Sequence, residues 1–207
     1  EGGIVTTNND KIALRLKLIR NHGEAVIDSF GFNLKGNIFG GNFRMNEIEA
    51  AIAIEQLKKL DFLTNHRKKL ANYLIRKLKK FDFLTLPEID NYENSHVFYF
   101  FVMQFNCEKI NLSREEFFAL CLKCGLELRK DYVKPAYLNS IYLKNKIYPK
   151  KNTQYKKYTY KKGLCPIAED ILKNKILFGK FCRYPLTKKH MDEIVSVFTY
   201  VYNLQKK

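Results

Sequence analysis

The chain has 207 residues, 46% of them hydrophobic, and a formal net charge of +16. This composition excludes a disordered chain, and the length predicts one large domain or two small ones. No run of about 18 uncharged apolar residues occurs, so we expect no membrane-spanning helix. The charge comes from 29 lysines and 8 arginines. Because proteins that read bases and phosphates favour the planar arginine fork, this balance argues against a nucleic-acid partner.

Five cysteines without a secretion signal predict reduced thiols in the cytoplasm. Cys121 and Cys124 form a C-x-x-C pair within a helical pattern that places both on the apolar stripe. A zinc site needs a second pair or a histidine cluster, and the sequence shows neither. We therefore expect two buried structural thiols, with zinc at this pair as the alternative.

The first predicted elements are a strand end at residues 3–7 and a helix that Asn9 or Asp10 caps and Gly23 ends. Residues 29–43 follow with four glycines, which indicates a loop. Since this loop also carries several phenylalanines, we expect it to pack against its own domain or a partner subunit.

The next segment, residues 42–86, contains no glycine or proline, which predicts one long helix or two abutting helices. Asn46 and Glu49 resemble a capping box at its start. Its first half is apolar on several sides, so we expect that half to be buried. Its second half is amphipathic, with an apolar line from Leu70 to Phe81. Such a helix is suited to bridge two domains.

Beyond Pro87 the pattern changes to that of a small α+β domain. The stretch "HVFYFFVMQF", residues 96–105, predicts a buried strand, and "LELRKDYV", residues 126–133, predicts a second one. Ser113 and Glu116 open a helix between them by a capping box. The remaining expectations are a helix stop at Gly125, a basic loop at 144–162, a helix from 167, a strand near 176–181 and a final helix around 194–201.

Five motifs, taken in order, resemble one protein family. They are "EGGIVTT", "RNHGE", "GGNFRMNEIEAAIAIEQLKKLD", "GLELRKDYVKPAYL" and "CPIAED". Their order and spacing are similar to those of the DegT/DnrJ/StrS-type aminotransferases. The resemblance implies an α/β fold class, the C-terminal part of a fold-type I pyridoxal-phosphate (PLP) transferase. It divides the chain into the end of the large PLP domain with an inter-subunit loop (1–45), a bridging helix region (46–86) and a small C-terminal α+β domain (87–207).

The resemblance also implies an activity. Family members use PLP to transfer an amino group, usually from glutamate, to a nucleotide-linked keto sugar, for example for a surface polysaccharide or glycan. They act as cytoplasmic homodimers with shared active sites. The family lysine that forms the Schiff base lies shortly before the position of Glu1, and none of the 29 lysines matches it. We therefore expect a missing N-terminal part and a fragment that is inactive alone.

For the cofactor, the resemblance implies that Asn42 binds the PLP phosphate of the neighbouring subunit and that Arg44 lies close by. Amide and guanidinium donors at a helix entrance suit a doubly charged phosphate. The alternative reading is that Asn42 adopts a left-handed turn and that Arg44 pairs with Glu47 or Glu49.

For the substrate, the resemblance implies that Lys130, Tyr132 and Lys134 face the nucleotide-sugar, although a solvated strand edge would show the same pattern. Asp131 departs from the small residue that relatives often carry there. His22 is read as a residue that satisfies the helix dipole.

Two other functions fit parts of the sequence. A truncated, catalytically inactive relative would act as an association module through its apolar loop and bridging helix. A basic RNA-binding protein would use the tyrosines and lysines of "YKKYTYKK", residues 155–162, for stacking and phosphate contacts.

Overall fold

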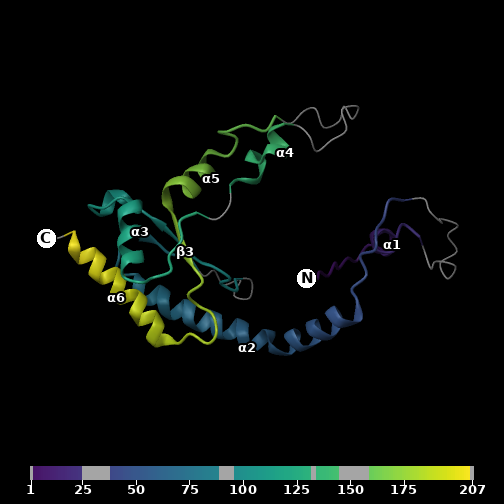
Figure 1. The fold of residues 1–207 in the computed structure, drawn as a ribbon, viewed down its shortest axis with the longest axis horizontal. Helices are drawn as coiled ribbons and strands as arrows, with labels where there is room; N and C mark the ends of the chain where they lie inside the picture. The colour runs from purple at the N-terminus through teal and green to yellow at the C-terminus, as the bar shows by residue number, and fades with distance from the viewer. Residues whose placement is uncertain (1, 25–37, 89–95, 132–133, 145–158, 206–207) are drawn as a thin grey trace. The chain divides into compact units, whose positions relative to one another are not determined.

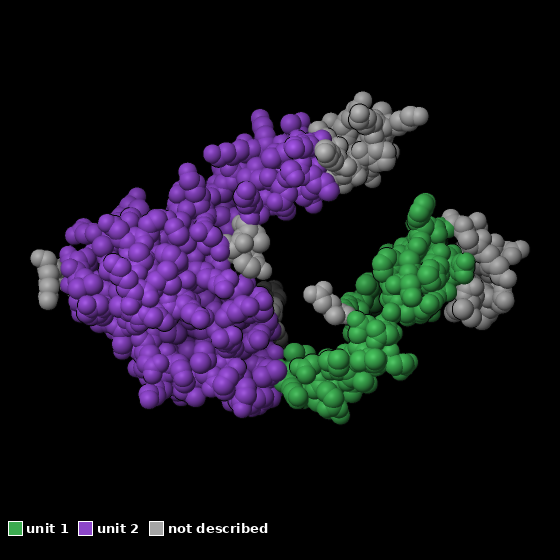
Figure 2. Space-filling view, in the orientation of Figure 1, with its two compact units in different colours: residues 1–61 green, residues 62–207 purple. Residues whose placement is uncertain are grey.

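The computed structural model describes residues 2–24, 38–88, 96–131, 134–144 and 159–205. The chain divides into two compact units, Glu1–Asp61 and Phe62–Lys207, which Figure 2 shows in separate colours. The boundary between them falls inside the longest helix, α2 (Glu47–Leu78). The three-part division predicted from the family resemblance places its boundaries elsewhere and stays a prediction.

The first unit contains α1 (Asp10–Arg20). The side-chain oxygen of Asn9 accepts hydrogen bonds from the backbone N–H groups of Lys11 and Ile12, at 3.0 and 3.2 Å, which confirms the predicted cap. Residues 3–7 form no strand, since a strand requires a hydrogen-bonded neighbour and the described chain supplies none beside them.

A close backbone contact follows α1. Gly23 has φ +75°, and a methyl group added there would overlap the carbonyl oxygen of Ile38. A methyl group at Gly40 would overlap the backbone nitrogen of Gly23. The N–H of Gly41 donates to the carbonyl of Ile19 at 2.9 Å. Glycine is therefore required here because the two backbone segments touch directly.

Helix α2 is continuous over 32 residues, which confirms the single long helix among the two predicted alternatives. Its capping box is also confirmed: the N–H of Glu49 donates to Asn46 Oδ1 at 2.8 Å, and the N–H of Asn46 donates to Glu49 Oε2 at 3.4 Å. The asparagine thus replaces the usual serine or threonine at this position.

The two halves of α2 differ in burial. Leu70, Leu74 and Leu78 in the second half are buried, as predicted. In the first half, Ile48 is 75% exposed and Leu57 is 61% exposed. The expectation that this half is buried is therefore wrong for the described chain, because no described segment covers its apolar side chains.

The second unit is built on a three-stranded antiparallel sheet in the order β1 (Leu84–Thr85), β2 (Phe101–Phe105) and β3 (Ile176–Gly179). The predicted strand at 96–105 is confirmed for its second half. The predicted strand at 126–133 is wrong for its described residues. Arg129 there forms one isolated bridge with Phe178 through two backbone hydrogen bonds of 2.8 Å each, and a single bridge does not make a strand.

Helices complete this unit (Figure 1). Helix α3 begins after Ser113, whose capping box with Glu116 is confirmed, and Gly125 closes it with φ +80°. The helical elements are a 3₁₀ turn at Cys107–Lys109, α3 (Arg114–Lys123), a 3₁₀ turn at Ala136–Leu138, α4 (Ser140–Leu143), α5 (Pro166–Asp170), a π-helix at Ile171–Lys175 and α6 (Lys188–Leu204).

The core of this unit is aromatic. Phe101, Met103 and Phe105 of β2 point to one face and are buried there. Phe117 of α3 and Phe198 of α6 are fully buried in the same cluster. The buried face of β2 and the apolar faces of α3 and α6 thus pack into one hydrophobic core.

The two C-x-x-C thiols differ. Cys121 is buried, and burial raises its pKa to about 12. Cys124 is exposed, because α3 ends at Lys123 and Cys124 occupies the C-cap. The expectation of two buried thiols is therefore wrong for Cys124. Within the described ranges, no group of three or more His, Cys, Asp or Glu residues is placed to hold a metal ion.

A helix that crosses a bilayer must be both long and apolar. None of the helices within the described ranges combines these two properties.

The aromatic core gives the first prediction. The Phe117 ring lies 5.2–5.4 Å from the rings of Phe83, Phe105 and Phe198. Phe117→Ala should lower the free energy of unfolding by about 3–5 kcal/mol, because it leaves a cavity. Urea denaturation measures this. Leu122→Ala, on the exposed side of the same helix, is the control and should change stability by less than about 0.5 kcal/mol. Equal effects would contradict the assigned core.

The glycine contact gives the second prediction. Gly40→Ala should push the turn away from α1 and weaken the bond from the Gly41 N–H to Ile19. Hydrogen exchange of the Gly41 amide should become about fivefold to tenfold faster. Gly3→Ala is the matched control, since nothing lies within 4 Å of a Cβ there. Unchanged exchange in Gly40→Ala would show that the turn is not held by this contact.

Candidate functional site

The first candidate site is the polar turn between α1 and α2. Asn42 forms an antiparallel bridge with Asn21, the C-cap residue of α1. The N–H of Phe43 donates to the carbonyl of Arg20 at 3.0 Å. The guanidinium of Arg44 donates to Asn21 Oδ1. Backbone and side-chain contacts therefore fix Asn42 and Arg44 to the end of α1, within the first unit.

The alternative reading of this turn is wrong in both parts. Arg44 contacts Asn21 rather than Glu47 or Glu49. Among the described non-glycine residues, positive φ occurs at His22 and at Phe98, so Asn42 is not left-handed. The Oδ1 atom of Asn42 instead accepts the N–H of Arg44 at 3.4 Å, which is a local Asx-type contact.

This arrangement leaves hydrogen-bond donors exposed. With its oxygen engaged, Asn42 keeps its amide NH₂ as a donor, and the guanidinium of Arg44 has five N–H groups of which Asn21 receives one contact. Glu47 and Glu49 in the first turn of α2 oppose an anion at the helix end itself. An anion would therefore bind to the side chains of the turn. The donors present fit a phosphate group.

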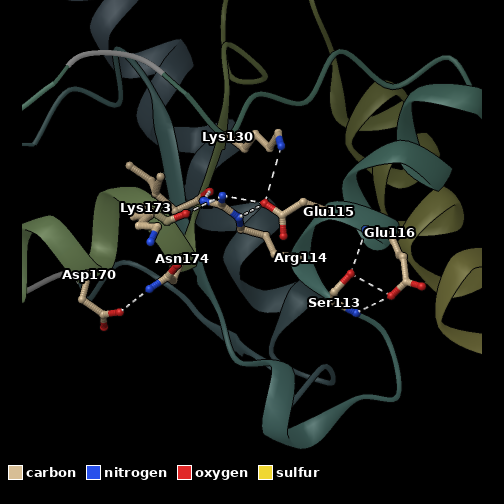
Figure 3. Close-up of polar contacts among 9 residues, drawn as sticks. Ser113, Arg114, Glu115, Glu116, Lys130, Asp170, Lys173 and Asn174 are labelled. Atoms are coloured by element: carbon tan, nitrogen blue, oxygen red, sulfur yellow. Dashed lines mark hydrogen bonds and ion pairs between the residues drawn. The ribbon is translucent and has the colours of Figure 1, made fainter.

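The second candidate site involves Lys130. Its ammonium lies 3.5 Å from Glu115 Oε1 and 5.4 Å from the centre of the Phe118 ring, as Figure 3 shows for the contact with Glu115. The structure therefore brings Lys130 onto α3. Lys134 is exposed, and Tyr132 lies outside the described residues.

Sequence reasoning missed Arg114 and Glu115 beside this lysine. Arg114 is buried and donates to Glu115 Oε1 at 2.7 and 3.2 Å. These hydrogen bonds hold the pKa of the Glu115 carboxyl below its ordinary value. The capping box of Ser113 and Glu116 was a usable signal, because it fixes the first turn of α3 on which both residues lie. Nothing in the sequence indicated the burial of Arg114.

A third polar cluster joins the motifs "KPAYL" and "CPIAED". The hydroxyl of Tyr137 donates to Glu169 Oε1 at 2.5 Å, and the N–H of Gly163 donates to the same oxygen at 2.8 Å. Partial burial, reinforced by the carboxylate, raises the pKa of Tyr137 to about 12, while the hydroxyl lowers the pKa of Glu169. The pair therefore connects two chain segments through hydrogen bonds to one carboxylate oxygen.

Half of the segment "YKKYTYKK" lies outside the described residues. In its described half, the Tyr160 ring packs edge-on against Tyr142 at 5.4 Å. This ring is engaged within the protein, which does not favour its use as a stacking platform for RNA.

Known proteins match the chain over most of its length. The sequence model of the DegT/DnrJ/EryC1/StrS aminotransferase family matches residues 1–196. The UDP-4-amino-4,6-dideoxy-N-acetyl-beta-L-altrosamine transaminase of Campylobacter jejuni is 31% identical over 150 residues, which are 70% of this chain and 37% of that protein. The protein of the same name from Helicobacter pylori is 32% identical over 146 residues, 69% of this chain and 36% of its own length.

Solved structures share the fold. The aminotransferase from Psychrobacter cryohalolentis matches with a TM-score of 0.76 at 18% identity, over 98% of this chain and 51% of that chain. The Bacillus subtilis protein NtdA, solved with bound cofactor PMP, matches with a TM-score of 0.68 at 21% identity, over 95% of this chain and 41% of that chain. The chain thus spans about a third to a half of the length of these proteins. The fold is that of fold-type I PLP-dependent transferases, and the chain belongs to the DegT/DnrJ/EryC1/StrS aminotransferase family.

Proposed function

We propose that this chain is part of a PLP-dependent aminotransferase that moves an amino group from glutamate to a nucleotide-linked keto sugar. Family membership supports the reaction class. The names of the Campylobacter and Helicobacter relatives support a UDP-linked sugar as the substrate. The observation that carries the proposal is the turn of Asn42 and Arg44, which presents anion-binding donors on a fixed backbone.

The cofactor supplies an electron sink for amino transfer when it is bound. The proposed task of this chain is to hold the cofactor phosphate. The amide NH₂ of Asn42 and the guanidinium of Arg44 donate charge-assisted hydrogen bonds to phosphate oxygens. In the proposed homodimer the phosphate belongs to the neighbouring subunit's site, so that each active site is shared.

The fixed turn explains why such donors bind well. Ordering a loop on binding costs about 0.5–1.5 kcal/mol for each immobilised flexible side chain. Asn42 is already placed by its bridge to Asn21, and Arg44 by its contact with the same residue. The side-chain amide of Asn21 therefore orders Arg44, the more flexible of the two side chains, before a phosphate binds.

The substrate is assigned to the second unit. We propose that Lys130 and Lys134 bind the nucleotide-sugar, and that Tyr132, which lies outside the described residues, does so with them. The contacts that order the Lys130 ammonium support this proposal. The product would be an amino sugar of the kind used in surface polysaccharides or glycans. By resemblance, none of the 29 lysines is the cofactor-binding lysine of the family.

An association module is the second candidate. The exposed apolar side chains at the start of α2 favour it, because a helix with such a surface is covered by another protein surface in most folded proteins. Association with a partner and catalysis can be measured separately, and the chimera described next tests both.

The third prediction tests the reaction. Residues 1–207 are joined to the part of the Campylobacter relative that the match leaves uncovered, and the chimera is supplied with PLP, glutamate and a UDP-linked 4-keto sugar. The chimera should form the amino sugar, measured by mass spectrometry, whereas the 207 residues alone should form none. A dimeric chimera that binds PLP and yields no amino sugar would contradict the proposed reaction and favour the association module.

The fourth prediction tests the turn. In the same chimera, Asn42→Ala should raise the Kd for PLP about tenfold, because it removes one hydrogen bond to a charged group. At saturating PLP the rate should stay within about threefold of the unsubstituted chimera, since binding and not chemistry is affected. Asn65→Ala, at an exposed position of α2, is the control. Equal PLP affinity in the two variants would remove Asn42 from the phosphate site.

A further inference from the structure

The charged cluster at the start of α3 contains a buried arginine. Arg114 is 5% exposed, and among the described residues it is the one charged side chain that is buried. Its guanidinium donates to the backbone carbonyls of Lys173 at 2.6 Å and Ile176 at 3.3 Å. These bonds connect α3 to the π-helix and to β3 (Figure 3). Arg114 is therefore anchored by main-chain carbonyl groups and not by flexible side chains.

A buried guanidinium requires a counter-charge, because an unpaired buried charge is strongly unfavourable. Glu115 supplies it through the two contacts of its Oε1 atom with Arg114, at 2.7 and 3.2 Å. The capping box of Ser113 and Glu116 fixes the backbone on which both residues lie. The Glu115 carboxylate is thus held in one place, and the hydrogen bonds from Arg114 hold its pKa below the ordinary value.

Lys130 is the third member of this cluster. Its ammonium contacts the same Oε1 atom of Glu115 at 3.5 Å. Two cations and one anion give the cluster a net charge of +1. Arg114 is buried and bonded to carbonyls, whereas the Lys130 side chain is 27% exposed. The positive charge therefore reaches solvent at Lys130.

The geometry points to a preorganised cation. A lysine side chain carries about 2 kcal/mol of rotamer entropy when it is free. Here the Glu115 carboxylate and the Phe118 ring restrict it from two directions, while a single long contact leaves ammonium N–H donors available. We propose that Glu115, anchored by Arg114, is a positioning residue that holds the Lys130 ammonium to receive a phosphate or diphosphate group. This rests on the proposed function, in which the substrate carries a diphosphate.

If Glu115 acted only through its negative charge, removing that charge would change anion binding in the opposite direction. Removing a negative charge next to Lys130 would by itself attract an anion more strongly. If Glu115 positions Lys130, removing its charge frees the lysine and weakens anion binding. The direction of the change therefore separates the two roles.

The experiment titrates the full 207-residue chain with inorganic pyrophosphate by calorimetry at low salt, where surface electrostatics are least screened. Lys130→Met should weaken binding about tenfold, as expected for one charge-assisted contact. Lys173→Met is its control, since it removes an equal charge from a residue whose backbone alone takes part in the cluster. Glu115→Gln keeps an oxygen for Arg114 and should weaken binding about threefold, a loss that reflects lost ordering of one side chain.

A double-mutant cycle completes the test. If Glu115 acts through Lys130, Glu115→Gln should cause no further weakening in the Lys130→Met background. Glu127→Gln is the control for the change in charge. The inference is overturned by absent pyrophosphate binding, by tighter or unchanged binding in Glu115→Gln, by equal weakening in both backgrounds, or by equal effects of Lys130→Met and Lys173→Met. Circular dichroism of each variant confirms that the titrated protein is folded.

UDP is titrated in parallel to separate this inference from the proposed function. Pyrophosphate binding that follows the predicted pattern without UDP binding would contradict the nucleotide-linked substrate and support the role of Glu115. UDP binding that is insensitive to Lys130→Met would support the nucleotide-linked substrate and overturn the role of Glu115.

Discussion

The candidate cofactor site depends on a direct backbone contact between two segments that are far apart in the sequence. Gly23 and Gly40 allow residues 38–43 to lie against the end of α1, because a Cβ atom at either glycine would overlap main-chain atoms. Several backbone hydrogen bonds form across this contact, and the bridge between Asn21 and Asn42 lies beside it. The polar turn is therefore held in place because Gly23 and Gly40 lack a Cβ atom.

Helix α2 is asymmetric in both charge and burial. Its first eleven residues carry three glutamates and no lysine, whereas the stretch from Lys58 to Lys80 is strongly basic. The basic half buries Leu70, Leu74 and Leu78 in the core of the second unit. The acidic half exposes isoleucines that no described residue covers. The two halves of this helix thus differ in charge and in burial, and its role as a bridge between domains stays a prediction.

The sequence predicted best those features that arise from nearby residues. The caps at Asn9, Asn46 and Ser113 were all correct, because a side chain that bonds to a backbone N–H three residues away leaves a local signature. Tertiary features were not accessible in this way. The position of Cys124 depended on where α3 stops, and the burial of Arg114 depended on carbonyls some sixty residues further along the chain.

The net charge of +16 gives little information about function, whereas the environment of single cations gives more. Arg114 is buried, paired and bonded to carbonyls, so its donors are used within the protein. Arg44 is exposed and ordered through Asn21, so donors remain for a ligand. Lys130 lies between these two cases, ordered by Glu115 and open to solvent. Because a bound anion must replace water around the cation, cations that the protein has already ordered are better candidates than the many solvated lysines.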